Sequence, residues 1–74
     1  MNKEQFLIDL AEILEEEEVN ANDVLNDFDA WDSLSILSII AYAQEHYKMQ
    51  LKNNEIRDLE TVADLISFIE SKSV

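Results

Sequence analysis

One serine in this sequence stands where a side chain could carry a chemical group. Ser33 follows Asp32 and precedes Leu34, at the junction between the acidic stretch DFDAWD and a long apolar segment. A serine nucleophile needs a base within hydrogen-bond reach, and the only histidine, His46, lies thirteen positions further along. On one continuous helix, at about 1.5 Å per residue, the two side chains would be about 20 Å apart. We therefore expect neither Ser–His catalysis nor any other catalytic residue.

The same acidic stretch could offer oxygen ligands to calcium, through Asp27, Asp29 and Asp32. An EF-hand counted from Asp27 requires a glycine at the position of Asp32 and a bidentate glutamate at that of Ser38. The sequence has neither residue, so we expect no specific metal site. Weak, diffuse binding of divalent cations by the acidic surface is the more plausible behaviour.

Length and charge restrict the possible functions further. The chain has 74 residues, a net charge of −12 and no cysteine, which fits a single domain (1–74) with a modest core and no large catalytic cleft. Its negative charge would repel nucleic acids and anionic lipid and favours basic protein surfaces. The lack of cysteine fits a reducing compartment, and no segment has the length of a membrane span or the pattern of a signal peptide. We expect a cytoplasmic protein without nucleic-acid partners or membrane insertion.

The hydrophobic periodicity predicts an all-α fold, a small four-helix bundle of three main helices and one short one. The main helices are expected over about 3–16, 33–47 and 61–72, and a short turn of helix within 54–59. Residues 19–32 are interpreted as a long loop that apolar side chains attach to the core: Val19, Val24, Leu25, Phe28 and Trp31. The chain has no glycine and no proline, so left-handed backbone positions are expected at asparagines: Asn20, Asn22, Asn26, Asn53 and Asn54.

Signals for helix ends support these boundaries. Asn2 and Gln5 form a possible start signal for the first helix, and Thr61 with Asp64 resembles a capping box for the last. The glutamate run 15–18 would lie at the C-terminal end of the first helix, where negative charge opposes the helix dipole. We expect that end to fray and interpret the run as a solvated helix end.

The helix that begins at Ser33 determines where its hydroxyl points. Asp32 or Ser33 would cap the early amides, which is worth about 1 kcal/mol and by itself explains both residue types. When Leu34, Leu37, Ile40 and Ala41 face inward, Ser33 is left exposed at the N-terminus of the helix. A phosphate ester there would lie near unsatisfied backbone N–H groups and the positive end of the dipole. The residues expected to turn inward are Leu34, Leu37, Ile40 and Ala41.

Asp32-Ser33-Leu34, after a long acidic loop and at the start of an apolar helix in a small acidic chain, resembles the acyl carrier protein family. The resemblance covers nearly the whole chain, including the segment LETVADLISFI. It implies that Ser33, between Asp32 and Leu34, is esterified by phosphopantetheine, which a phosphopantetheinyl transferase donates from coenzyme A. The arm's thiol would carry acyl or aminoacyl groups as thioesters. The resemblance thus implies a monomeric phosphoprotein of lipid or secondary-metabolite biosynthesis that serves acyl-loading and acyl-transfer enzymes and is no enzyme itself.

A carrier of this kind also needs an apolar interior that can shelter an acyl chain. The sequence leaves open whether that interior holds a cavity or is a filled core that only an acyl chain would open. The residues expected to line it are Leu34, Leu37, Ile40, Ala41, Ile56, Leu59, Val62 and Ile66.

The second helix departs from carriers that resemble the fatty-acid-synthesis members of the family, which display acidic residues along it. Ser35, Ser38 and Gln44 stand where acids might be expected, and Glu45 remains. Ile36, Ile39 and Ala43 extend its apolar surface, so the helix is either deeply buried, which we favour, or shows partners an apolar strip. Trp31 replaces a small residue before the Asp-Ser pair. We therefore predict a specialised carrier with dedicated partner enzymes, recognised through Trp31, Ser35, Ile36, Ser38, Ile39 and Glu45.

A helical protein–protein interaction domain without a prosthetic group is the alternative function. It would have the same fold and the same charge. The two hypotheses differ in whether Ser33 accepts phosphopantetheine.

Overall fold

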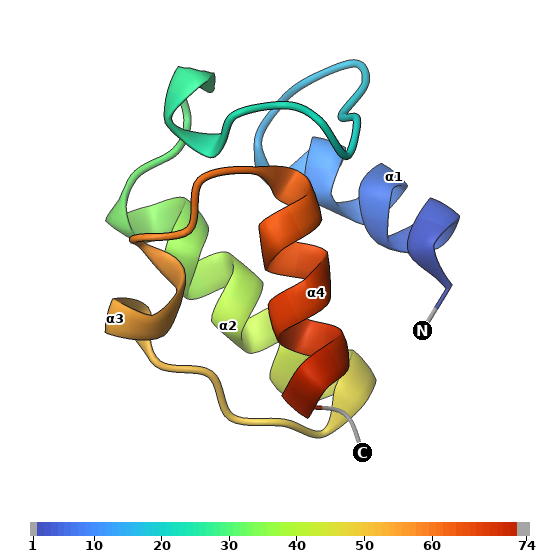
Figure 1. Cartoon of the computed structure of the whole chain (residues 1–74), viewed down its shortest axis with the longest axis vertical. Helices are drawn as coiled ribbons and strands as arrows, with labels where there is room; N and C mark the ends of the chain where they lie inside the picture. Colours follow the sequence, from blue (N-terminus) through green and yellow to red (C-terminus); the bar gives the residue numbers. More distant parts are fainter. Residues whose placement is uncertain (1, 73–74) are drawn as a thin grey trace.

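Four α-helices make up most of the part of the chain that the structure, a computed structural model, describes, residues 2–72. They are α1 (Lys3–Ile13), α2 (Ser33–Tyr47), α3 (Asn53–Ile56) and α4 (Val62–Lys72), and a 3-10 turn, η1 (Leu25–Asp27), interrupts the loop between α1 and α2. In Figure 1, α4 crosses in front of α2, and the long loop passes over the end of the bundle. Among residues 2–72 the only β-type pairing is an isolated bridge between Val24 and Thr61. The predicted all-α, four-helix architecture is confirmed.

Two helix starts are capped as the sequence predicts. Asn2 Oδ1 accepts a hydrogen bond of 3.1 Å from the backbone N–H of Gln5. At α4, Thr61 Oγ1 accepts from the Asp64 N–H at 3.1 Å, and Asp64 Oδ2 accepts from the Thr61 N–H at 3.2 Å. Thr61 and Asp64 thus form a complete capping box. The Gln5 side chain donates to Asp9 and does not return to Asn2, so α1 has only half of the motif.

The first helix ends earlier than predicted, at Ile13. Glu15 adopts the left-handed conformation at φ 58, and the N–H of Glu16 donates to the carbonyl of Ala11 at 2.9 Å. The expectation that asparagines would hold the left-handed positions is wrong, since Glu15 and Lys48 hold them. Both residues lie at helix C-termini, where a left-handed residue lets the chain leave the helix. The left-handed positions are therefore set by where the helices end and not by the presence of asparagine.

A single hydrophobic core joins all four helices and the long loop. Val62, Leu65, Ile66 and Ile69 of α4 are buried, as their spacing predicts. The loop contributes buried Val19 and Leu25 and partly buried Phe28 and Trp31, whereas Val24 is 41% exposed. Fully burying each such side chain is worth about 1.5–3 kcal/mol. The largest fully buried side chains are Phe6, Leu10, Leu14, Leu25, Ile39, Ile56, Leu65, Ile69 and Val62.

The buried face of α2 differs from the prediction. Leu34 and Leu37 are 74% and 55% exposed, Ala41 is exposed, and Ile40 is half-buried. The assignment of Leu34, Leu37 and Ala41 to the interior is therefore wrong. The α3 and α4 part of the predicted interior is correct: Ile56, Val62 and Ile66 are buried, and Leu59 packs against the core.

The residues that do face the core from α2 are Ser35, Ile36, Ile39 and Ala43. The deep burial favoured for Ile36, Ile39 and Ala43 is thus confirmed, and the assignment of Ser35, Ile36 and Ile39 to a partner surface is wrong. At about 100° per residue, the predicted and observed faces lie about 160° apart on the helix and are nearly opposite. Because α2 has apolar residues on nearly every side, periodicity alone does not distinguish these two orientations.

Candidate functional site

Ser33 is the first residue of α2 and is exposed. The side chain before it fixes the start of the helix. Asp32 Oδ1 accepts from the N–H of Ser35 at 3.0 Å, and Ser35 Oγ accepts from the N–H of Asp32 at 3.0 Å. Ser35 is buried, whereas Ser33 and Leu34 are exposed at this end of the helix.

The backbone amides at this end could accommodate an anion. The N–H of Ile36 donates to the Asp32 carbonyl at 3.0 Å, and that of Ser35 to the Asp32 carboxylate. Among residues 2–72, no acceptor is found for the amides of Ser33 and Leu34 or hydrogen-bond partner for the Ser33 hydroxyl. Two free donors and the positive end of a 15-residue helix lie beside an outward hydroxyl, an arrangement that favours a phosphate group.

A shallow hollow of about 200 Å³ lies next to Ser33, between the C-terminal end of α1 and the start of α2. Leu34 and Ser38 line it from α2, and Glu15 and Asp32 contribute carboxylates. A larger hollow, of about 400 Å³, lies further along α2, lined by Leu37, Ile40, Ala41, Gln44, Gln50, Leu51 and Lys52.

Both hollows border one exposed face of α2, which we call the outer strip: Leu34, Leu37, Ser38, Ala41 and Glu45. These positions follow the three-and-four spacing of a helix face. Glu45 is the charged residue of the strip, and it lies in the C-terminal half of the helix. The Ser38 hydroxyl donates to the Leu34 carbonyl at 3.1 Å, so its polarity is turned back onto the helix. The outer strip is therefore apolar over the part nearest Ser33.

Of the residues predicted for partner recognition, Ser38 and Glu45 lie in the outer strip. Trp31 is half-buried and packs against the core. The outer strip contains Leu34 and Leu37, which sequence analysis placed inside. No signal in the sequence distinguishes their exposure from burial, because α2 has apolar residues on nearly every side.

Comparison with known proteins supports the resemblance found in the sequence. An acyl carrier protein of Arthrobacter sp. strain FB24 is 33% identical over 75 residues, which cover 92% of this chain and 91% of the relative. An acyl carrier protein of Acidothermus cellulolyticus is 31% identical over 81 residues, covering 100% of this chain and 95% of the relative. This chain belongs to the acyl carrier protein family.

A more distant acyl carrier protein, from Exiguobacterium sibiricum, is 26% identical over 78 residues, covering 97% of this chain and 99% of the relative. No family model matches the chain, and no solved structure matches it significantly. Within residues 2–72, no helix combines the length and the apolar character needed to cross a membrane. The same residues contain no group of three or more His, Asp or Glu side chains placed to hold a metal ion.

In this member of the acyl carrier protein family, His46 lies at the opposite end of α2 from Ser33. It is part of an aromatic cluster with Tyr42. His46 is exposed and stacks on Tyr42, with ring centroids 4.3 Å apart. The Tyr42 hydroxyl donates to Asp9 of α1, and this bond is the main reason that the pKa of Asp9 is lowered. Burial, followed by the bond to Asp9, raises the pKa of Tyr42. The cluster links α1 to α2.

Proposed function

We propose that this protein is a carrier of acyl or aminoacyl groups, held as thioesters on a phosphopantetheine arm esterified to Ser33. The observation that supports the proposal most strongly is the exposed Ser33 hydroxyl at the N-terminus of α2, which has no hydrogen bond to any of residues 2–72. Membership of the acyl carrier protein family gives the same expectation. When bound, the arm supplies a thiol that a chain without cysteine does not have.

The residues around Ser33 would position the attachment without catalysing it. Asp32 holds the first turn through Ser35, and the amides of Ser33 and Leu34 would donate to the phosphodiester. No base of this chain contacts the Ser33 hydroxyl among the described residues, so a phosphopantetheinyl transferase would supply the base. In that step the Ser33 oxygen would bond to the phosphorus that bears the pantetheine of coenzyme A, and the P–O bond of the pyrophosphate linkage would break. Adenosine 3′,5′-bisphosphate would leave, and the serine proton would pass to the transferase.

The outer strip supports the second part of the proposal, a specialised carrier with dedicated loading and transfer enzymes. Leu34 and Leu37 are exposed next to the attachment point, and Leu34 shares a hollow with the carboxylates of Glu15 and Asp32. Such a surface fits a partner that presents an apolar pocket close to its active-site entrance. The net charge of −12 would speed the encounter with a basic partner, while the strip itself would hold the complex.

The modification is tested by incubating the apo protein with coenzyme A and a broad-specificity phosphopantetheinyl transferase, then measuring intact mass. The proposal predicts the addition of one phosphopantetheine to the wild type and none to Ser33→Ala. Ser67→Ala is the matched control, since Ser67 is also exposed but lies on α4, and it should be modified like the wild type. No addition, or an addition that persists in Ser33→Ala, would instead favour an interaction domain without a prosthetic group.

A further inference from the structure

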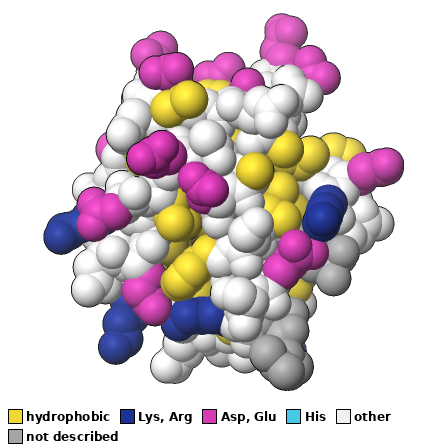
Figure 2. Space-filling view, viewed as in Figure 1, with side chains coloured by type: hydrophobic (Ala, Val, Ile, Leu, Met, Phe, Trp, Pro, Cys, Tyr) yellow, Lys and Arg dark blue, Asp and Glu magenta, His cyan; other side chains and the backbone are white. Residues whose placement is uncertain are grey.

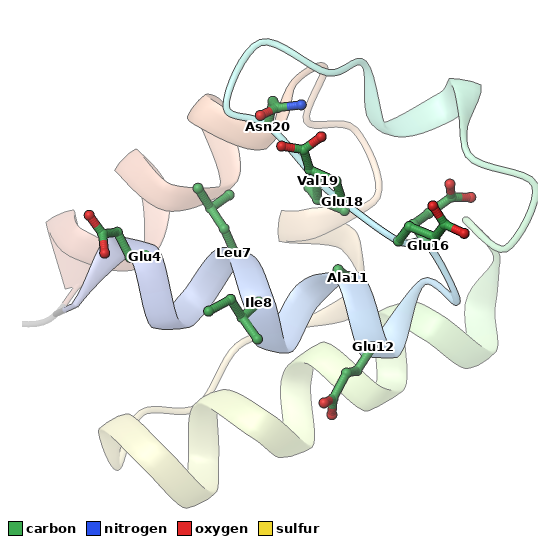
Figure 3. Close-up of a pocket in the computed structure, with 10 residues that line it drawn as sticks. Glu4, Leu7, Ile8, Ala11, Glu12, Glu16, Glu18, Val19 and Asn20 are labelled. Carbon is green, nitrogen blue, oxygen red and sulfur yellow. The ribbon is translucent and has the colours of Figure 1, made fainter.

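A hollow distinct from the surroundings of Ser33 lies along α1 (Figure 3). It has a volume of about 540 Å³ and lies between α1 and the segment that follows this helix. Its floor is apolar and its rim is acidic. We call it the α1 groove, with the floor residues Leu7, Ile8, Ala11 and Val19 and the rim residues Glu4, Glu12, Glu16, Glu17 and Glu18.

The groove results from the way α1 ends. The left-handed Glu15 and the bond from Glu16 N–H to the Ala11 carbonyl reverse the chain, and the following residues return over the helix (Figure 3). Val19 anchors this return because it is buried, at 4% exposure. Ile8, on the open side of the groove, remains 57% exposed. Ile8 is thus a large aliphatic side chain exposed to solvent beside the segment that Val19 holds against the core.

The rim charges have no partner within the described part of the protein. The ion pairs found there join Lys3 to Glu70, Arg57 to Asp58 and Lys72 to Glu55, and none involves a rim carboxylate. Adjacent glutamates repel one another, and those after α1 also oppose the helix dipole. Figure 2 shows the general excess of acidic over basic side chains on one face of the molecule. A cationic partner would remove this unfavourable repulsion.

We propose that the α1 groove binds an amphipathic helix of a partner protein, with apolar side chains on the floor and lysine or arginine side chains against the rim. An open groove of about 540 Å³ has room for a few leucine-sized side chains. In helix-in-groove recognition, an amphipathic helix places its apolar side chains in such a groove. A second copy of this chain is a poor occupant, because two molecules of net charge −12 would place acidic rims against each other.

This contact is separate from the proposed carrier site. The lining residues of the groove include none of those in the hollow next to Ser33 and none of the outer strip. The groove would therefore bind its partner whether or not Ser33 carries an arm. Failure of one proposal leaves the other unaffected, because each is tested with its own variants.

The test uses a synthetic amphipathic peptide of leucine and lysine, titrated into isotope-labelled protein and followed by NMR. The expected result is saturable binding, with the largest amide shifts at Leu7, Ile8, Ala11 and Val19. Ile8→Gln should weaken binding about tenfold or more, the size of loss typical of a central apolar contact. Leu37→Gln is the matched control, because Leu37 is 55% exposed against 57% for Ile8, and it should bind the peptide like the wild type.

Charge is tested by Glu17→Gln/Glu18→Gln against Asp58→Asn/Glu60→Gln, two double variants that each remove two exposed charges. The rim pair should weaken the peptide at least threefold more than the distant pair. Three results would overturn the proposal: equal loss in both pairs, equal loss in Ile8→Gln and Leu37→Gln, or equal affinity for a peptide with serine in place of leucine. Far-UV circular dichroism of Ile8→Gln keeps the result interpretable, and an exposed position should leave the helical signal unchanged.

Discussion

The outer strip of α2 and the α1 groove expose similar apolar side chains, but more carboxylates surround the groove. Leu34 and Leu37 are exposed beside Ser38, whose hydroxyl donates to the Leu34 carbonyl of the same helix. Ile8 is exposed to a similar degree but is surrounded by carboxylates. The difference shows that net charge alone does not describe how an acidic protein meets its partners. One surface favours an apolar contact next to the attachment serine, and the other favours a basic helix.

The largest effect is expected when one substitution on each surface is tested both with a loading enzyme and with the groove peptide. Leu37→Gln should lower the catalytic efficiency of a cognate loading enzyme toward this carrier about tenfold or more, because an exposed aliphatic anchor is lost. Ile8→Gln should leave that efficiency within about twofold and weaken only the groove peptide. Steady-state kinetics with the loaded carrier measure the first effect. Equal loss in both variants would show that the two surfaces act as one.

Salt should separate the two surfaces by a smaller factor. Between about 0.1 M and about 1 M salt the screening length falls from about 10 Å to about 3 Å, so binding of the basic peptide to the α1 groove should weaken several-fold. Docking through the outer strip should keep its dissociation rate, while its association rate falls with the loss of long-range steering. Stopped-flow measurement of both rates distinguishes these cases, and a strongly salt-dependent dissociation rate would contradict an apolar strip.

The contact between Tyr42 and Asp9 holds the helices that bear the two surfaces. Tyr42→Phe removes the bond to a carboxylate and should lower the free energy of unfolding by about 1–2 kcal/mol, with Asp9→Asn as the companion variant. The bond lowers the pKa of Asp9 in the folded protein. Its stabilisation is therefore full above the unfolded pKa of about 3.8 and is lost as pH falls through the folded value.

Urea unfolding of the wild type and Tyr42→Phe at several pH values measures this dependence. The difference between them should be constant near neutral pH and shrink in acid. A difference that grows as the pH falls would contradict the assigned hydrogen bond.

The smallest stability effect is expected at the cap of α2. Asp32→Ala removes the side-chain acceptor for the Ser35 N–H and should cost about 1 kcal/mol of unfolding free energy. Thr61→Ala, which removes the equivalent cap of α4, is the matched control for stability. Asp32→Ala alone should also slow modification of Ser33, because the first turn that presents the hydroxyl loosens. Similar modification rates in both variants would show that Asp32 acts on stability alone.

The sequence predicted helix existence better than helix orientation. The boundaries of α2 at Ser33 and Tyr47 and the capping box at Thr61 follow from local signals, which a single helix carries in its own residues. The orientation of α2 does not, because the pair Leu34 and Leu37 and the pair Ile36 and Ile39 form two apolar faces about 160° apart. Packing against α1 and α3 selects one of them, and this packing depends on residues outside α2.

The candidate site was predicted in part for the same reason. The exposure of Ser33 depends on its place at a helix start and follows from sequence. The membership of the partner surface depends on orientation, so Ser35, Ile36 and Ile39 were misplaced. The α1 groove was not predicted, because the glutamate run gave no sign that the chain would turn back over α1 after Glu15.

The central claim is that one hydroxyl, on Ser33, holds the arm. Fragmentation mass spectrometry of the protein purified after exposure to coenzyme A and a transferase tests it most directly, because it locates the added group on a single residue. The account predicts phosphopantetheine on Ser33 and an unmodified Ser35 and Ser38 beside it. A group found on either neighbour, or a Ser33 that stays unmodified while other carriers in the same reaction are converted, would contradict it.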